Sequence, residues 1–329
     1  MSAANTDIAT SAEYPEAEDG KNADAELNTP SKTSQDDERP VAPDQFDPKY
    51  QSTKWEIWAY YAYYIGNNGL TLFNFAPTSF QNLLYEAAGD GEVLSFFGRD
   101  RTINSIVLLC NGISFAIQVV LFLMLGSLAD YGRWRPWILV FWSVIAFGIG
   151  FGWLGVHTSG KWHVAVGLYV TGLLSYQLTI TFWTAAFPGL ARNTPEMRKK
   201  AEEFEQGDID RDQYDFHDMM QRNRISNVAF IAQSAGEVLI LAILVGILFA
   251  LDVNASQENN NWGLSVLIAY CTGWWVVLAI PWFVLEKRRP GNRIPAGLNI
   301  VTVLPWTLWR AMVQIWELKQ TLLYLVGYL

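Results

Sequence analysis

From residue 57 onward the chain alternates between long apolar stretches and shorter polar connections. A helix needs about 20 apolar residues to cross the hydrocarbon core of a bilayer. Six stretches reach that length, so the pattern predicts an all-α, polytopic membrane protein with a six-span bundle at 55–285. The expected spans are about 57–82, 103–128, 135–156, 164–187, 226–251 and 263–285.

The chain changes character after the sixth expected span. Residues 286–329 begin with a basic linker, continue into WTLWRAMVQIWELKQ, and end in the apolar run TLLYLVGYL. The middle segment has the pattern of an amphipathic surface helix. The last run is too short to cross a bilayer. We therefore expect a truncated seventh span, which would make the chain a fragment or the product of a truncated gene model.

Charge is concentrated in the first 54 residues. Only 17% of the chain is charged, against roughly 25% in an ordinary soluble domain. Residues 1–54 hold 12 Asp or Glu and 5 Lys or Arg, so most of the net charge of −9 lies there. This composition is typical of disorder, and we predict a disordered acidic tail. The remainder has no basic face for nucleic acid, and the tail lacks the pattern of a cleaved signal peptide.

Lys and Arg gather in alternate connections. The connection at 188–225 and the segment after the sixth span are basic, whereas 157–163 and 252–262 hold few basic residues. The positive-inside rule then places the N-terminus and the 188–225 connection in the cytosol. The sequon that begins at Asn254 falls on the opposite side, so Asn254 is a candidate glycosylation site.

Some of the expected spans contain polar side chains, and others contain almost none. The spans at 135–156 and 263–285 are nearly free of them and can face lipid all round. The other spans carry polar residues that lipid cannot satisfy. We expect a substrate-binding cavity to draw on these spans. The candidate substrate-binding residues are Tyr64, Asn67, Asn68, Asn74, Gln177, Thr181, Trp183, Gln233 and Glu237.

Helical periodicity places several of these residues on shared faces. Gln177, Thr181 and Thr184 recur at i, i+4 and i+7, and Gln233 and Glu237 are four apart. Glu237 is the single acid deep in a span. A carboxylate there must be protonated, paired or in contact with water. It is a candidate for proton coupling, or else a buried structural carboxyl.

The stretch YYIGNNGL places a turn signal in the middle of the first expected span. Two interpretations of Asn67 and Asn68 remain open. The amides could hydrogen-bond between packed helices, or they could line a cavity at a broken helix, as unwound spans do in transporters. Gly66 and Gly69 would permit close helix approach or a local kink.

Between the second and third spans, GSLADYGRWRPW resembles the loop of major facilitator superfamily transporters. Gly126, Asp130, Gly132, Arg133 and Arg135 match its pattern of glycine, acid and base. The interval from Asp130 to Gly132 is one residue shorter than usual. The resemblance implies that the acid pairs or caps across helix ends and holds one conformer of alternating access.

A closer resemblance covers residues 55–329. The segments WEIWAYYAYYIGNNGLTLFNFAPTSFQNLL, FWTAAFPGLARNTPE, NRISNVAF and LPWTLWRAMVQIWELKQTLLYLVGYL are similar to the fungal autophagy-related vacuolar effluxer family, the twenty-second of the autophagy-related proteins. The resemblance implies a twelve-span protein of the vacuolar membrane. It also implies export of leucine, isoleucine and tyrosine type amino acids from the lumen to the cytosol. The chain would be its N-terminal half.

Two other functions remain open. A sugar–cation symporter of the same superfamily would use stacking Trp and neutral amides, with no required carboxylate. A nutrient sensor or scaffold would bind partners through the tail and loops without transport. The spans hold no Ser-His-Asp set, metal cluster or phosphate loop, so we expect neither enzyme activity nor a cofactor. The expected partners are amino acids, the lipid bilayer and protons.

Overall fold

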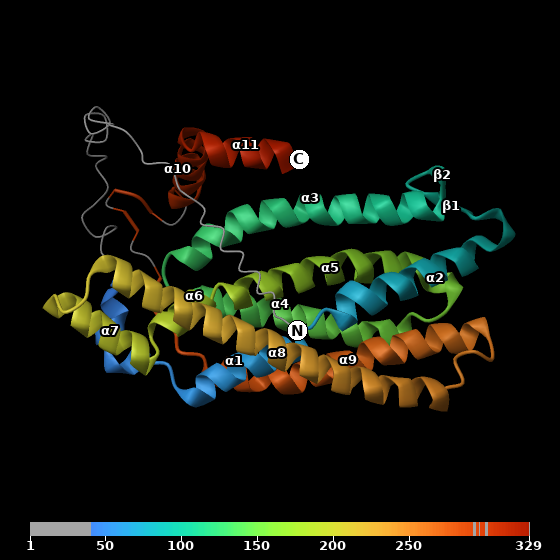
Figure 1. Cartoon of the computed structure of the whole chain (residues 1–329). Helices are drawn as coiled ribbons and strands as arrows, with labels where there is room; N and C mark the ends of the chain where they lie inside the picture. Colours follow the sequence, from blue (N-terminus) through green and yellow to red (C-terminus); the bar gives the residue numbers. More distant parts are fainter. Residues whose placement is uncertain (1–40, 292–293, 296, 300–301, 329) are drawn as a thin grey trace, which may run out of the picture. The chain divides into compact units, whose positions relative to one another are not determined.

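The computed structural model describes residues 41–291, 294–295, 297–299 and 302–328. The acidic tail predicted at 1–54 lies outside the described residues as far as position 40. Five helices among those described are long and apolar enough to cross a membrane, which confirms the all-α, polytopic prediction. They are α3 (Ile103–Asp130), α4 (Arg135–Gly152), α5 (Trp162–Thr184), α8 (Arg211–Ala250) and α9 (Gln257–Leu285) (Figure 1).

The residues of the first expected span do not form one helix. They form α1 (Lys54–Gly66), a π-helical segment η3 (Leu70–Phe75) and α2 (Ala76–Ala88). Gly69 interrupts the helix with a φ of +90°, a conformation that glycine adopts without the steric cost of a Cβ. The Asn68 Oδ1 accepts the Leu70 N–H at 3.0 Å, which satisfies a backbone donor that the break exposes.

Short elements connect the helices at their ends. Two of them form a β-hairpin, β1 (Val93–Phe96) with β2 (Arg99–Thr102), which the hydrophobic pattern does not predict. Phe97 and Gly98 both have positive φ, as a two-residue hairpin turn requires. The 3₁₀ turns are η1 (Pro43–Phe46), η2 (Pro48–Tyr50), η4 (Gly89–Gly91), η5 (Trp153–Gly155) and η6 (Ser159–Lys161).

The connection expected at 188–225 is mostly helical. It contains α6 (Phe187–Arg192), α7 (Pro195–Gln206) and the first turns of α8. The Asp210 side chain accepts the Gln213 N–H at 2.8 Å and forms a capping box. This cap starts α8 well before the apolar run that predicted a span at 226.

Two further helices follow α9. They are α10 (Val303–Glu317) and α11 (Lys319–Tyr328). α10 covers most of the segment expected to form an amphipathic helix, and its Thr307 hydroxyl donates to the Tyr131 hydroxyl at 3.5 Å. Trp309 and Trp316 are exposed.

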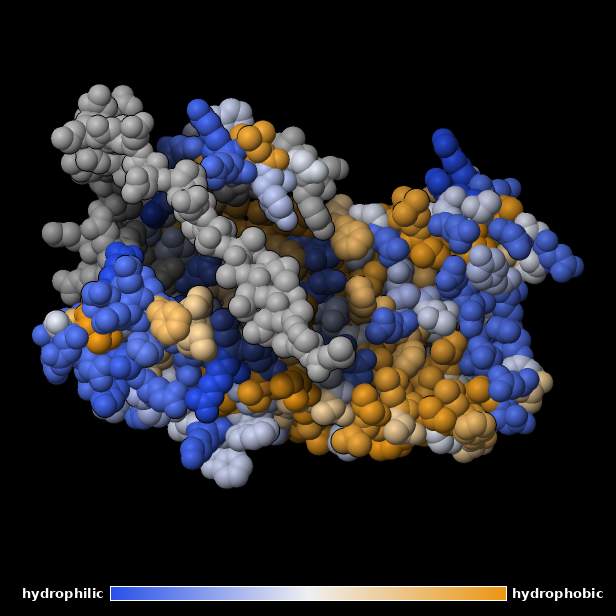
Figure 2. Space-filling view, viewed as in Figure 1, coloured by the Kyte–Doolittle hydropathy of each residue, from blue (hydrophilic) through white to orange (hydrophobic). Residues whose placement is uncertain are grey.

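Glycine allows α1 to pack closely against two other helices. A Cβ on Gly66 of α1 would lie 2.8 Å from the Trp275 Cα of α9. A Cβ on Gly236 of α8 would lie 2.3 Å from the side chain of Ile65. α1 therefore lies in direct contact with both α8 and α9. On the face in Figure 2, hydrophobic residues gather along the middle of the helices and hydrophilic residues at the ends.

Candidate functional site

The break in the first expected span lies in the packed core. Asn67 is 1% exposed, and its Nδ2 donates to the Thr179 Oγ1 of α5 at 3.3 Å. The Thr179 hydroxyl donates in turn to the Tyr176 carbonyl at 2.8 Å. Within the described part of the chain the Asn67 Oδ1 has no hydrogen-bond partner. An unsatisfied buried acceptor costs about 1–3 kcal/mol of stability. A ligand that donated a hydrogen bond to this oxygen would remove that cost.

An aromatic cluster lies one turn before the break. Trp183 of α5 stacks with Tyr60 at 4.3 Å and with Tyr64 at 4.6 Å between ring centroids. Trp183 is 4% exposed, and its indole N–H also has no partner among the described residues. The hydroxyls of Tyr63 and Ser143 share a hydrogen bond of 3.0 Å. α1 is thereby fixed to α5 by ring stacking and to α4 by a buried hydrogen bond.

α8 places the Glu237 carboxylate in the same region. Phe230 contacts Tyr64 edge to face at 5.7 Å, and the Gln233 Nε2 donates to the Glu237 Oε2 at 2.5 Å. Glu237 is half-buried and interacts electrostatically with the Tyr64 and Tyr176 phenols. The structure therefore gathers Tyr64, Trp183, Gln233 and Glu237 around α1.

Other predicted site residues lie apart from this cluster. Asn74 and Thr181 are exposed, and Gln177 is half-buried. Thr181 and Thr184 line an open hollow of about 430 Å³ on the outer face of α5. The Asn68 side chain accepts a hydrogen bond from the Leu70 N–H in its own turn. The periodic stripe on α5 thus marks the exposed face of that helix.

Sequence reasoning missed the two α5 residues closest to the break. Thr179 is fully buried and bonds to Asn67, and the Tyr176 hydroxyl would meet a Cβ on Gly69 at 3.0 Å. Thr179 belongs to a different face of α5 from Gln177, Thr181 and Thr184. A single Thr in an apolar helix is also common as packing, so no sequence signal distinguishes it.

The amide of Asn111 has an interhelical role. The Tyr169 hydroxyl of α5 donates to the Asn111 Oδ1 of α3 at 2.6 Å. This bond joins two apolar helices in the way that amides do inside membranes.

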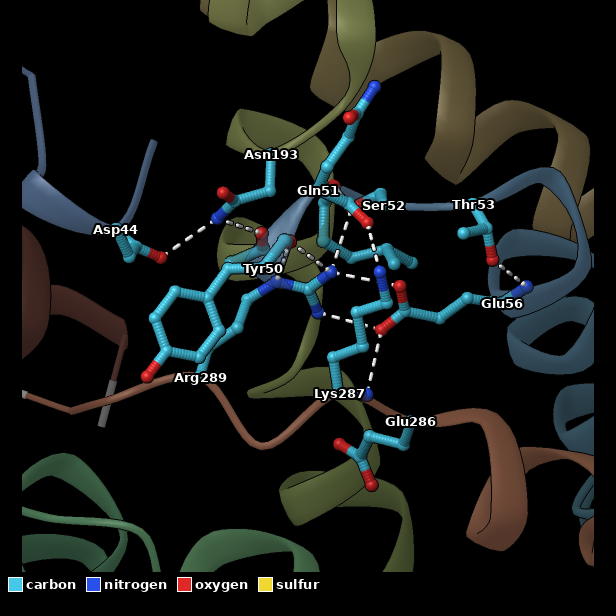
Figure 3. A network of polar contacts seen from close by, with 12 residues as sticks. Asp44, Tyr50, Gln51, Ser52, Thr53, Glu56, Asn193, Glu286, Lys287 and Arg289 are labelled. Atoms are coloured by element: carbon cyan, nitrogen blue, oxygen red, sulfur yellow. Dashed lines mark hydrogen bonds and ion pairs between the residues drawn. The ribbon is translucent and has the colours of Figure 1, made fainter. Parts of the chain in front are cut away.

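A polar network joins the start of α1 to the segment after α9 (Figure 3). Arg289 forms a bidentate ion pair with Glu56, with distances of 2.8 and 2.9 Å. Its guanidinium also donates to the Ser52 hydroxyl at 2.9 Å and to the Tyr50 carbonyl. Both charged side chains are buried, at 8% and 0% exposure. The segment expected as a basic linker is therefore bonded to α1.

The same network extends to residues on either side. The Lys287 ammonium donates to the Gln51 carbonyl at 2.6 Å, and its backbone N–H donates to the Glu56 Oε1 at 3.0 Å. Asp44 accepts hydrogen bonds from Arg192 and Asn193. The residues before α1 are thus held against the helices that follow α5.

The predicted loop motif contributes its arginines to this end of the helices. Arg135, at the start of α4, pairs with Glu286 at 2.5 Å and donates to the Phe182 carbonyl at 3.3 Å. Gly132 has a φ of +90°, and its carbonyl accepts the Gly291 N–H at 2.7 Å. The carboxylate that pairs across helix ends is that of Glu286; among the described residues Asp130 is exposed and forms no ion pair.

Two further loop-motif residues and the glycosylation candidate Asn254 lie elsewhere. Arg133 donates to the Tyr50 hydroxyl at 3.4 Å, and a Cβ added at Gly126 would meet no atom within 4 Å. Asn254 is exposed in the turn between α8 and α9. Its glycosylation stays a prediction.

Burial dominates the electrostatics of Glu286. It raises the pKa of that carboxyl above its ordinary value, while the neighbouring Arg135 guanidinium acts in the opposite direction. Glu286 therefore takes up a proton at a higher pH than an exposed glutamate does. Its ion pair with Arg135, which joins α4 to the residue after α9, should therefore weaken as the pH falls.

Comparison of the chain with known protein families identifies the family to which it belongs. The family model described as Vacuole effluxer Atg22 like matches residues 52–329. The chain belongs to this family. No curated protein and no solved structure matches it. This vacuole effluxer family consists of transporters rather than enzymes, which gives the chain a transporter-like role in the vacuolar membrane. Among the described residues, no group of His, Cys, Asp or Glu could hold a metal ion.

Proposed function

We propose that the protein exports amino acids of the leucine, isoleucine and tyrosine type from the vacuole lumen to the cytosol. The observation that carries this proposal is the broken helix between α1 and η3. It presents a buried amide oxygen on Asn67, without a partner among the described residues, near the aromatic cluster of Tyr60, Tyr64 and Trp183. Broken helices line substrate sites in transporters.

The chemistry of the cluster suits a zwitterion with an apolar side chain. The ammonium needs acceptors, which the Asn67 Oδ1 and the Glu237 carboxylate can provide. The carboxylate needs donors, and the Trp183 indole N–H and the Gln233 amide are within the same cluster. The rings of Tyr60 and Tyr64 would form the apolar wall.

Alternating access would move α1 against α5 and α8. The break at Gly69 lets α1 and α2 reorient separately, because a glycine absorbs the change in φ and ψ. The polar network at the start of α1 would hold one of the two conformers. In the proposed orientation, as in the major facilitator superfamily, this network and the N-terminus face the cytosol, consistent with its basic residues.

A sugar–cation symporter is the second candidate function. The residue that supports this function is Trp183, because indole rings stack on sugar rings. In this structure, however, Trp183 already stacks with Tyr60 and Tyr64, and a half-buried carboxylate lies nearby. Both features favour the amino acid. A sensor without transport activity is distinguished only by the experiment below.

The test is efflux of labelled leucine from isolated vacuoles that carry the protein, with and without a pH gradient. We expect Glu237→Gln to reduce efflux by at least about tenfold and to remove its pH dependence, because a neutral amide can neither pair with an ammonium nor carry a proton.

The matched control is Glu258→Gln, the same substitution at an exposed residue in the first turn of α9. It should leave efflux unchanged. Normal, pH-dependent efflux in Glu237→Gln would exclude a role for this carboxylate. If correctly inserted protein moved no amino acid at all, the amino-acid proposal would be wrong and the sugar and sensor functions would be tested next.

A further inference from the structure

A second cavity lies at the start of α1 and of α7, beside the stretch of α8 from Gln221 to Val228. Its volume is about 640 Å³. One part of its lining is polar, with the basic residues Lys54, Arg224 and Lys287, and the other part is apolar, with Ile57, Trp58 and Val228. A cavity with a cationic rim and an apolar wall suits an amphiphilic anion.

The three cations of the rim form few strong interactions with the protein. Arg224 pairs with Glu196 at 3.3 Å, but both side chains are about two-thirds exposed, at 67% and 66%. Such an exposed pair contributes little, so the guanidinium can turn to a stronger ligand. Lys287 donates one bond to the Gln51 carbonyl, which leaves two ammonium protons. Lys54 is exposed at the first residue of α1. Three cations face one carboxylate in the lining.

The apolar wall has the character of a membrane interface. Trp58 is 61% exposed and lies one turn along α1 from Lys54, and Trp55 beside it is 75% exposed. Trp next to Lys or Arg at a helix end is typical of the boundary between headgroups and acyl chains. The cationic rim and the apolar wall beside it match the order of phosphate and first methylenes in a phospholipid.

The cavity is separate from the proposed substrate site. Its α8 residues include Arg224, Ile225 and Val228. Phe230, Gln233 and Glu237 lie on another face of the same helix, roughly half a turn away at 3.6 residues per turn. The cavity thus opens on the side of α8 that faces away from Trp183 and Glu237.

We propose that this cavity binds an anionic phospholipid. The headgroup phosphate is held by Lys54, Arg224 and Lys287, and an acyl chain lies along Ile57, Trp58 and Val228. A lipid in this place bridges α1 to α7 and α8, and so supports the helix that carries the break. Clusters of Lys and Arg beside a membrane helix attract anionic lipid in this way.

The test uses the full chain purified in detergent and titrated with phosphatidylinositol 4-phosphate or phosphatidylcholine, with bound lipid counted by native mass spectrometry. We expect the anionic lipid to be retained and the zwitterionic lipid to be lost. The variant Lys54→Gln/Arg224→Gln should bind the anionic lipid roughly thirtyfold more weakly, since two charges are removed from the phosphate site.

Three arms decide the outcome. Lys199→Gln/Arg211→Gln removes two exposed cations that do not line the cavity and should bind like the unmodified chain. Val228→Trp fills the apolar wall and should also weaken binding. Inositol 1,4-bisphosphate, which has no acyl chain, should not compete. Equal binding by all variants, or full competition by the soluble headgroup, would overturn the proposal.

Discussion

Replacing Arg289 by Met while Glu56 is kept should lower the free energy of unfolding by about 3–5 kcal/mol, the usual cost of leaving one buried charge without its partner. Glu56 is 0% exposed and has the Arg289 guanidinium as its ion-pair partner. The substitution also removes donors from the Ser52 hydroxyl and the Tyr50 carbonyl. The measurement is unfolding in mixed detergent micelles.

Two variants separate the buried pair from general loss of charge. Asp215→Asn breaks the exposed pair of Arg211 and Asp215 and should change stability by no more than about 1 kcal/mol. Glu56→Gln/Arg289→Met should recover part of the loss, because no buried charge then remains. If Arg289→Met were as stable as Asp215→Asn, the network would not hold α1 to the segment after α9.

The second large effect is expected at Gly66. Gly66→Ala should destabilise the protein by about 1–3 kcal/mol, the typical cost of overpacking a core. The added Cβ would lie 2.8 Å from the Trp275 Cα and 3.3 Å from its carbonyl oxygen. These are backbone atoms of α9, so no side-chain rotation can relieve the contact, and α1 must move away from α9.

The matched control for Gly66 is Gly148→Ala. Gly148 lies inside α4, and a Cβ there would meet no atom within 4 Å. Ala is the better helix former, by up to about 1 kcal/mol, so this variant should be neutral or slightly stabilising. If Gly66→Ala were equally well tolerated, the close approach of α1 to α9 would not be needed for packing.

The sequence predicted more of the helices than of the candidate site. An apolar run long enough to cross a bilayer favours a helix, because a helix satisfies its backbone amides internally. The run expected at 57–82 departs from this at Gly69. The five long helices follow from that rule. The hairpin at Val93–Thr102 lies in a polar connection, where no such constraint acts and the local turn at Phe97 and Gly98 decides.

Within the candidate site, the sequence singles out individual residues but not their partners. Asn67 and Glu237 stand out because polar groups are costly in a membrane. Thr179, which bonds to Asn67, and Arg289, which pairs with Glu56, carry no such signal. Their roles depend on which faces of two helices meet, and the helices that meet are far apart along the chain.

The sequence by itself determined the all-α class and the family, and it marked Gly66 and Gly69 as places where a kink was possible. The structure decided that the helix breaks there. Hydrophobic length marks which segments can cross a bilayer, and Gly69 can adopt a φ that other residues avoid. The tertiary structure decided that α1 lies against α9, with Gly66 at the contact. It also decided that Glu286, not Asp130, is the partner of Arg135. Such pairings depend on the packing of one helix surface against another, which composition and periodicity do not specify.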